Sequence, residues 1–483
     1  MRRASIWVVR LGCLAAAGVL AGCVSMAPDY RAPALPVAAH YPDVEVSSGL
    51  DAAATDWQDY FTDPRLRQLI AQALENNRDL RVAASRVEQA RAAYGIQRAD
   101  LFPALNASVG EIRARLPAGA DPLGVPLSLE QYQAGAVASS WELDFWGRLR
   151  NLNDAARDNY LASRAAQRAL ALSLIAQVAN DWLSLRELDE RIFLAQQTID
   201  SRRETLRIFS RRVEVGATSR LNLTQVQTLL TQAEALGAQL RQAREVQAHA
   251  LTLLVGQPLE LPPIAEPLDE NRLLADLSPG LPSDLLTRRP DILAAEYQLR
   301  AADANIGAAR AAFFPRVALT GAYGSASDEL NQLFDAGTHA WIFAPSISLP
   351  LFEGGKLRRN LDLNNARRDE AVAHYEQTVQ GAFRDVSDAL SARHWLAEQV
   401  VIAQTALDVQ TERARLSKLR FDAGSASFLE VLDAQRDLLS AQQQLVQLRR
   451  ALLSSRVGLY AALGGGLREA STSPSSVSGA SQP

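Results

Sequence analysis

The chain has 483 residues, a formal net charge of −4 at pH 7 and an aromatic content of only 6%. Its apolar residues are mainly Ala and Leu, mixed with Arg, Gln and Glu, a composition typical of long helices packed closely side by side. No basic patch with interleaved aromatic residues is present, which argues against a nucleic-acid partner.

The N-terminus has the pattern of a secretory signal. Arg2 and Arg3 precede an apolar run from Leu11 to Val19 that is too short to span a bilayer. Leu20-Ala21-Gly22-Cys23 then resembles the lipoprotein box of bacteria, which implies removal of residues 1–22 and acylation of Cys23. An ordinary signal peptide with an incidental cysteine is the alternative. Val24 replaces the usual inner-membrane retention residue, Asp, so outer-membrane delivery is expected.

Residues 23–62 are predicted to form an extended, lipid-anchored arm, because they are rich in Pro and lack helical periodicity. A helical pattern begins at Asp63-Pro64 and continues to about Ala99, before Phe102-Pro103. The hydrophobic period then changes from that of a helix to that of a strand.

Apolar residues alternate with small or polar ones in four segments. They are Leu105–Val109, Trp141–Phe145, Val317–Tyr323 and Trp341–Leu351, with a Pro- and Gly-containing loop at Pro117–Pro126. Such alternation is typical of membrane β-strands, although a solvated hairpin is the alternative for any one of them. Four strands are too few to close a barrel, and open sheet edges cannot lie in lipid. We therefore expect an oligomer whose chains pool their strands.

After the second strand the helical period returns. About 60 residues from Leu149 to Arg212 contain neither Pro nor Gly, which corresponds to a helix on the order of 90 Å long. Gly216-Ala217-Thr218-Ser219 follows, with the pattern of a helix end, a left-handed glycine and the N-cap of a new helix.

The same pattern of helix end, glycine and N-cap recurs 208 residues later in Gly424-Ser425-Ala426-Ser427, and Gly147 matches Gly355 at the same spacing. A shared offset indicates one structural unit used twice. We predict a first repeat at residues 63–257, a Pro-rich linker at 258–282, a second repeat at 283–463 and a disordered Ser-rich tail at 464–483.

No enzyme or cofactor motif competes with this interpretation. The five His residues are scattered without paired ligand spacing, and no P-loop, dinucleotide fingerprint or nucleophile elbow occurs. The sequence predicts a non-enzymatic protein without metal or cofactor.

Several motifs resemble the TolC family of outer-membrane efflux channels, in its lipoprotein branch typified by OprM and NodT. They are Arg288-Arg289-Pro290-Asp291-Ile292, Phe313-Phe314-Pro315, Leu349-Pro350-Leu351-Phe352-Glu353-Gly354-Gly355 and Leu432-Asp433-Ala434-Gln435-Arg436. The resemblance implies a mostly α fold, a homotrimer with an α-barrel of long antiparallel coiled-coil helices in the periplasm, and a shared twelve-stranded transmembrane β-barrel. It implies a passive exit duct for drugs or other small toxic compounds, working with a periplasmic adaptor and an inner-membrane transporter of the RND type.

Leu429, Asp433 and Arg436 share one helix face, at spacings of four and three residues. That face lies opposite the stripe of Val431, Ala434 and Leu438. The resemblance implies that the three residues line a closed periplasmic aperture, whereas the residues alone fit an ordinary solvated ion pair. The first repeat has Gln225 and Thr228 in place of the Asp and Arg, so a gate would be asymmetric.

The resemblance further implies that the two glycine turns, Gly216–Ser219 and Gly424–Ser427, dock the adaptor; the alternative is that they are merely exposed turns. A non-conducting coiled-coil lipoprotein scaffold is the competing function. Among channels, a metal-efflux or protein-secretion duct also remains open.

Overall fold

The computed structural model describes residues 25–34, 37–38, 50–51, 55–117, 127–264, 266–268, 274, 277–278 and 288–466. The chain divides into two compact units. Unit 1 comprises Met1–Ala34, Arg86–Arg164 and Ala294–Glu376, and unit 2 comprises Leu35–Ser85, Ala165–Leu293 and Gln377–Pro483. Each unit therefore draws segments from both predicted repeats.

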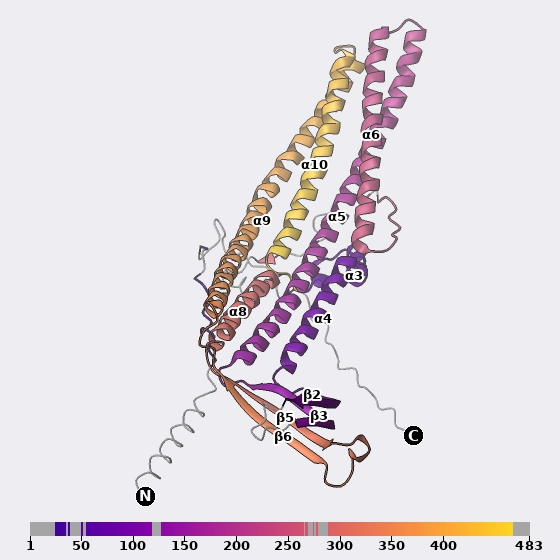
Figure 1. Ribbon diagram of the computed structural model, residues 1–483. Coiled ribbons are helices and arrows are strands. Elements are labelled where there is room, and N and C mark those ends of the chain that lie inside the picture. Colours follow the sequence, from indigo (N-terminus) through magenta and orange to yellow (C-terminus); the bar gives the residue numbers. More distant parts are fainter. Residues whose placement is uncertain are drawn as a thin grey trace. The chain divides into compact units, whose positions relative to one another are not determined.

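Unit 1 contains an antiparallel sheet with strand order β2-β3-β5-β6 (Figure 1). Its strands are β2 (Leu105–Leu116), β3 (Leu127–Leu143), β5 (Arg316–Ser327) and β6 (His339–Ser348). Pairing of β3 with β5 joins the hairpin of one repeat to the hairpin of the other. Consequently β2 and β6 are the two edges, and within the described residues neither pairs with a further strand.

The two faces of this sheet differ in chemistry. Residues directly opposite each other on paired strands point to the same face. The register therefore gathers on one face large apolar side chains that are mostly exposed in the single chain: Leu105, Val109, Tyr323, Trp341, Phe343 and Ile347. The opposite face carries mainly small or polar residues, including Asn106, Ser108, Thr320, Ser346 and Ser348, although Val137 and Ile342 also lie on it. The predicted alternation therefore holds for most positions of the sheet.

A β-bulge keeps this alternation in phase along β3. The register steps from Ala138 opposite Gly321 to Trp141 opposite Leu319, so β3 contains one residue more than β5 over this step. Ser140 takes a φ of +48°, the left-handed region that few non-glycine residues adopt. The extra residue returns Trp141 to the apolar face and Glu142 to the polar face.

The long helices follow the predicted repeat closely. Helices α5 (Arg148–Glu214) and α9 (Lys356–Asp422) each have 67 residues and begin 208 positions apart. Helices α6 (Arg220–Val255) and α10 (Phe428–Ala462) also begin 208 positions apart. In unit 2, α5 turns back into α6 and α9 turns back into α10, as Figure 1 shows.

The seams of these helices are buried at most of the positions that the hydrophobic period marks. The α6 stripe of Val226, Leu230, Ala233 and Leu240 is almost fully buried. On α10, Val431, Ala434, Leu445 and Leu452 are buried in the same way, whereas Leu438, Ala441 and Leu448 of the same stripe are only half-buried. Small residues at intervals along such stripes let helix axes approach closely.

An aromatic cluster forms the core of unit 2. Tyr60, at the end of the short helix α2 (Trp57–Tyr60), stacks on Tyr460 with ring centroids 4.4 Å apart. Phe61 packs edge-on against both rings. Trp182 of α5 is also buried and donates its Nε1–H to Asp63 Oδ2 at 3.0 Å. The C-terminal end of the predicted arm therefore belongs to the core.

The helix predicted from residue 64 to residue 99 is two helices, α3 (Pro64–Asn76) and α4 (Arg78–Ala99). Asn77 breaks it because its side chain has two other partners. Its Oδ1 accepts the N–H of Leu80 at 3.0 Å, and its Nδ2 donates to the Leu254 carbonyl at 2.8 Å. The side chain thus caps α4 and ties it to α6.

Two strands end earlier than the sequence suggested. β3 stops at Leu143, so Phe145 lies outside it, because Asp144 turns away to accept the N–H of Arg150 at 2.8 Å. β6 stops at Ser348, two residues before Pro350, which cannot donate to a ladder. Helix α8 (Pro290–Ala311) starts inside the Arg288–Ile292 motif, with Asp291 in its first turn.

The described part of the predicted linker is tied to α5 and α6. Asp189 accepts the N–H of Ile264 at 3.1 Å and also contacts Arg244 of α6 at 2.5 Å. Glu190 accepts the N–H of Leu268 at 3.0 Å. None of the helices in the described ranges combines the length and the apolar composition needed to cross a bilayer.

Candidate functional site

Both glycine turns have the predicted geometry. Gly216 and Gly424 have φ of +74° and +70°, and each follows the last turn of a 67-residue helix. The N–H of Ala217 donates to the Arg212 carbonyl at 2.7 Å, and the N–H of Ser425 donates to the Arg420 carbonyl at 2.9 Å. These bonds satisfy carbonyls that the helix ends leave free.

The restart of each hairpin differs in detail. Ser219 is the N-cap of α6 and accepts the N–H of Asn222 at 3.2 Å. Ser427 is the N-cap of α10 by position, but its side chain caps nothing. Instead, Arg420 donates to Glu430 at 2.6 Å and spans the second turn.

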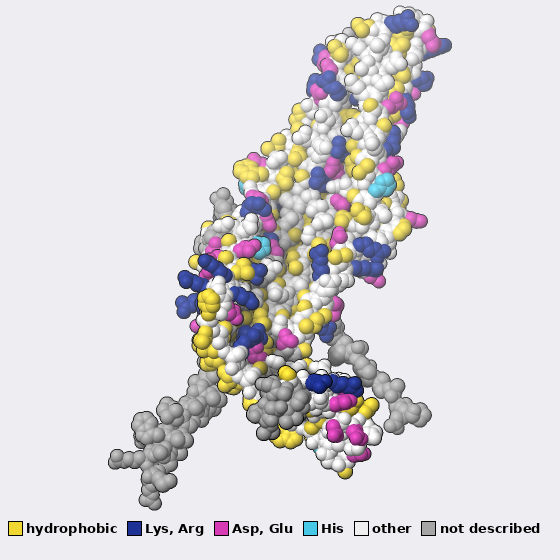
Figure 2. All heavy atoms as spheres, in the orientation of Figure 1, with side chains coloured by type: hydrophobic (Ala, Val, Ile, Leu, Met, Phe, Trp, Pro, Cys, Tyr) yellow, Lys and Arg dark blue, Asp and Glu magenta, His cyan; other side chains and the backbone are white. Residues whose placement is uncertain are grey.

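An aromatic cluster beneath the turns joins the two hairpins within unit 2. Phe209 of α5 and Phe428 of α10 have ring centroids 4.1 Å apart, and Phe421 of α9 lies 4.9 Å from Phe428. Val226, Val431 and Leu432 complete a buried cluster around them. The turns are therefore held on a packed apolar base. Figure 2 shows basic and acidic side chains interspersed over this end of the helices.

The predicted aperture residues lie together on one exposed face of α10. Leu429 is 49% exposed, whereas Val431 and Ala434 are buried. Asp433 Oδ1 lies 3.4 Å from Arg436 Nη1, and both side chains are about half exposed. Two of the three residues of the predicted opposite stripe, Val431 and Ala434, are buried and Leu438 is half-buried, while the aperture role stays a prediction.

Two further residues belong to this cluster. Arg436 donates to Asp437 Oδ1 through Nε at 3.2 Å and through Nη2 at 3.1 Å. Asp437 Oδ2 accepts a hydrogen bond from Arg413 of α9 at 2.7 Å. Donation from Arg413, ahead of that from Arg436, holds the pKa of Asp437 below its ordinary value. We call Arg413, Asp433, Arg436 and Asp437 the α9–α10 charge cluster.

The α9–α10 charge cluster could be read only in part from the sequence. Asp437 directly follows Arg436, so its position next to the Asp433–Arg436 pair can be predicted from the sequence alone. Arg413 precedes the turn at Gly424 by eleven residues and Asp437 follows it by thirteen. Pairing them requires the register of the antiparallel helices, which a repeat offset does not supply.

Cys23 lies outside the described residues, but the segment that follows it is fixed to unit 1. Ser25 Oγ donates to Asn151 of α5 at 2.7 Å, and Arg310 of α8 donates to the Met26 carbonyl at 3.2 Å. Tyr30 donates to Glu296 at 3.0 Å, and Arg300 lies 4.7 Å from the Tyr30 ring. Burial, followed by the bond to Glu296, raises the pKa of Tyr30 to about 12.

Within the described residues, no group of three or more His, Cys, Asp or Glu side chains converges as a metal ion would require.

Comparison with known proteins identifies relatives along nearly the whole chain. The model of the outer membrane efflux protein family matches twice, at residues 69–257 and 281–465. The toluene efflux pump outer membrane protein TtgF of Pseudomonas putida is 44% identical over 467 residues, which covers 94% of this chain and 96% of that protein.

Solved structures agree. A membrane protein from Pseudomonas aeruginosa superimposes with a TM-score of 0.84 at 39% identity and covers 92% of this chain and 98% of its own. The open state of the MtrE outer membrane channel of Neisseria gonorrhoeae gives a TM-score of 0.83 at 37% identity, with coverage of 92% and 98%.

Proposed function

The chain belongs to the outer membrane efflux protein family, and on that premise we propose that it is the passive exit duct of a tripartite pump for small toxic organic compounds. The family is one of outer-membrane channels. The cargo class is suggested by relatives such as TtgF, whose name specifies toluene. An inner-membrane transporter would supply the energy, since a duct without a catalytic site cannot.

The sheet of unit 1 carries this proposal. One face presents exposed Val109, Trp341 and Phe343, and the opposite face presents mainly small and polar residues, with Ile342 as an apolar exception. A lipid-facing strand of a channel requires this division, because one face meets acyl chains and the other meets water. A coiled-coil scaffold on the membrane surface gains nothing from exposing such a face.

The free edges of the sheet support oligomerisation. In hydrocarbon, the unpaired N–H and C=O groups of β2 and β6 would each cost several kcal/mol. Pairing β6 of one copy with β2 of the next removes every edge once the ring closes. Three copies supply twelve strands, and we propose the homotrimer as the functional state.

The turns and the α9–α10 charge cluster take their proposed roles from the same family. The Gly216–Ser219 and Gly424–Ser427 turns would contact a periplasmic adaptor, with an RND-type transporter as its partner. Leu429, Asp433 and Arg436 would line the periplasmic aperture. Cys23 would carry the lipid anchor, next to the arm that Ser25, Met26 and Tyr30 hold on unit 1.

Single-channel recording in planar bilayers tests the duct directly. Purified protein should form discrete conducting events and migrate as a trimer in detergent. A stable monomer that still inserts, or a trimer that gives no conductance under any voltage, would favour the scaffold. Mass spectrometry of the mature N-terminus should find an acylated Cys23, and an unmodified or different first residue would exclude the anchor.

A further inference from the structure

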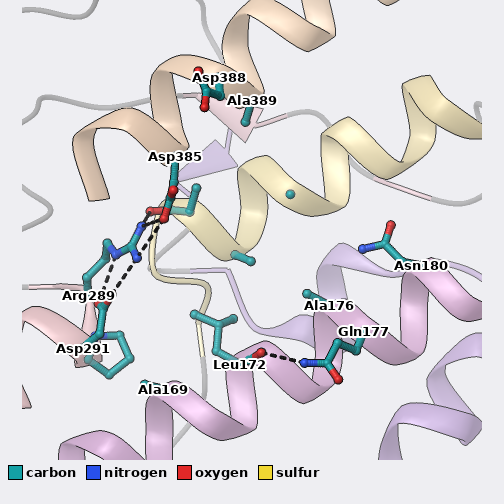
Figure 3. A pocket seen from close by; sticks show the side chains of 15 residues that line it. Ala169, Leu172, Ala176, Gln177, Asn180, Arg289, Asp291, Asp385, Asp388 and Ala389 are labelled. Atoms are coloured by element: carbon teal, nitrogen blue, oxygen red, sulfur yellow. Dashed lines mark hydrogen bonds and ion pairs between the residues drawn. The ribbon is translucent and has the colours of Figure 1, made fainter. Parts of the chain in front are cut away.

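A cavity of about 500 Å³ lies within unit 2, where α5, the start of α8, α9 and α10 meet (Figure 3). Its size falls in the range of small-molecule sites. Small residues from three helices leave the space open: Ala169, Ala176, Ala389, Gly458, Ala461 and Ala462. A Cβ built on Gly458 would meet no atom within 4 Å.

The repeat relates two of the cavity's walls. Gln177 and Asn180 of α5 occupy the positions of Asp385 and Asp388 of α9, because both pairs differ by the repeat offset of 208. Equivalent faces of the two repeats thus line one space, with amides on one wall and carboxylates on the other. The two repeats therefore carry different side chains, neutral amides and charged carboxylates, at corresponding positions.

Arg289 closes one end of the cavity and is fully engaged. It donates to both oxygens of Asp291 at 2.6 and 3.0 Å, and to the Ala462 carbonyl at 3.1 Å. Asp385 lies 3.4 Å away and also accepts from Arg384 at 2.8 Å. The hydrogen bond from Arg289 to the Ala462 carbonyl has a counterpart in the first repeat, the bond from Asn77 to the Leu254 carbonyl. Arg289 thus ties the start of α8 to α10, as Asn77 ties the start of α4 to α6.

The carboxylates outnumber the guanidinium groups that contact them. Within the described residues, the ion pairs of Asp291, Asp385 and Asp388 are made with Arg289 and Arg384, so three carboxylates share two guanidinium groups. Asp388 is the least compensated, since Arg384 lies 3.9 Å from it and its side chain is 75% exposed. A positively charged ligand therefore complements this wall.

The opposite wall carries amides instead of carboxylates. Asn180 Oδ1 is itself shielded from solvent, and no donor among the described residues reaches it. In Figure 3 the Asn180 amide lies at the end of the cavity away from Arg289 and Asp291.

We propose that this cavity binds a small organic cation with an apolar body, its charge at Asp388 and its body against the alanine wall. A bare metal ion fits less well, because no metal-type cluster of His, Cys, Asp or Glu occurs among the described residues. The site depends on unit 2 alone, so it does not require that the protein conduct.

Tetraphenylphosphonium is a suitable probe, with tetraphenylborate as the anion of matching shape. Equilibrium dialysis of the purified full-length protein in detergent should show saturable binding of the cation and none of the borate. Asp388→Asn should weaken binding about tenfold, the effect of losing one contact to a charged group. Gly458→Leu should abolish binding by filling the space.

Asp362→Asn is the matched control, since Asp362 is an exposed carboxylate on the same helix, is paired with Arg359 and is not among the residues that line the cavity. It should bind like the parent. Equal binding of cation and borate would overturn the proposal, as would Asp388→Asn and Gly458→Leu proteins that bind the cation with parental affinity.

Discussion

Arg413 of α9 donates to Asp437 of α10 at 2.7 Å, and this bond joins the two helices of the second hairpin beside the predicted aperture. Asp437 is shared with Arg436, which is also 3.4 Å from Asp433. The predicted gate pair therefore belongs to a cluster that reaches α9. In a single chain these side chains are between 32% and 58% exposed, and such pairs contribute at most about 1 kcal/mol each.

The first prediction is that Asp433→Ala with Arg436→Ala loosens the aperture. Three-fold symmetry would bring the charges together in a narrow, less hydrated ring, where their interactions strengthen. The double variant should show higher single-channel conductance and should admit large hydrophilic antibiotics through the envelope. A correctly assembled trimer with parental conductance would place the constriction elsewhere.

Asp437→Asn gives a second, sharper test of the same region. The substitution keeps the shape of the side chain but weakens the bonds from Arg413 and Arg436 together. We expect the single-channel conductance of Asp437→Asn to equal or exceed that of Asp433→Asn, because within this cluster Asp437 is the residue that links α10 to α9. The reverse ranking in the same bilayer assay would show that the inter-helix bond does not restrain the aperture.

The third prediction concerns the turns. Gly216 and Gly424 have positive φ, which costs a β-branched residue roughly 1–2 kcal/mol but which Asn tolerates. Gly424→Val should therefore abolish export while Gly424→Asn largely retains it, if the turn's shape docks a partner. Trimer yield and outer-membrane location should be unchanged in both.

Gly381→Val provides the control for bulk, because a Cβ there meets nothing within 4 Å and the residue lies inside α9. It should export normally. Unchanged export when both turn glycines are replaced by Val would mean that the turns are exposed loops without a docking role.

The repeat and the long helices could be predicted from the sequence for two reasons. The helices show in the local hydrophobic period, and the repeat shows in the constant spacing of 208 residues between matching positions. The 208-residue spacing reappears in the starts of α5 and α9 and in the two turn glycines. The break at Asn77 is not evident in the sequence because one of the two partners of its side chain is the carbonyl of Leu254, 177 residues away. Phe145 was assigned to a strand because it continues the alternation, although Asp144 had already turned to cap α5.

The residues of the candidate site also fall into two groups, those that local spacing predicts and those that depend on contacts between helices. Leu429, Asp433 and Arg436 share a face by helical spacing alone, and the structure agrees. Arg413 was missed because its contact depends on how α9 and α10 align across their turn. The cavity beside Arg289 was also missed, since Gln177 and Asp388 come from different repeats and no motif joins them.

The fourth prediction is that Tyr30 ionises about two pH units above an ordinary tyrosine. Its pKa is raised from 10.0 to about 12, so the neutral hydroxyl is favoured in the folded state. The stability that it contributes is complete below pH 10 and is lost as the pH rises from 10 to about 12. The absorbance titration of the parent minus that of Tyr30→Phe should show this late midpoint, and a difference curve centred near 10 would mean that the arm is not held.

The last prediction concerns the bulge at Ser140. Its left-handed φ of +48° strains a serine by about 1 kcal/mol or more, and glycine adopts this conformation freely. Ser140→Gly should therefore leave insertion intact and raise the temperature at which the trimer dissociates in detergent.

Deletion of Ser140 removes the extra residue, so the strand beyond it must invert its faces. Trp141 would then point to the polar side and Glu142 to lipid, where a carboxylate is costly. The deletion protein should fail to reach the outer membrane as a trimer. Deletion of Ala120, from the segment that connects β2 to β3, is the control for chain length and should assemble normally. A deletion at Ser140 that assembles and conducts like the parent would show that the bulge does not set the faces of the sheet.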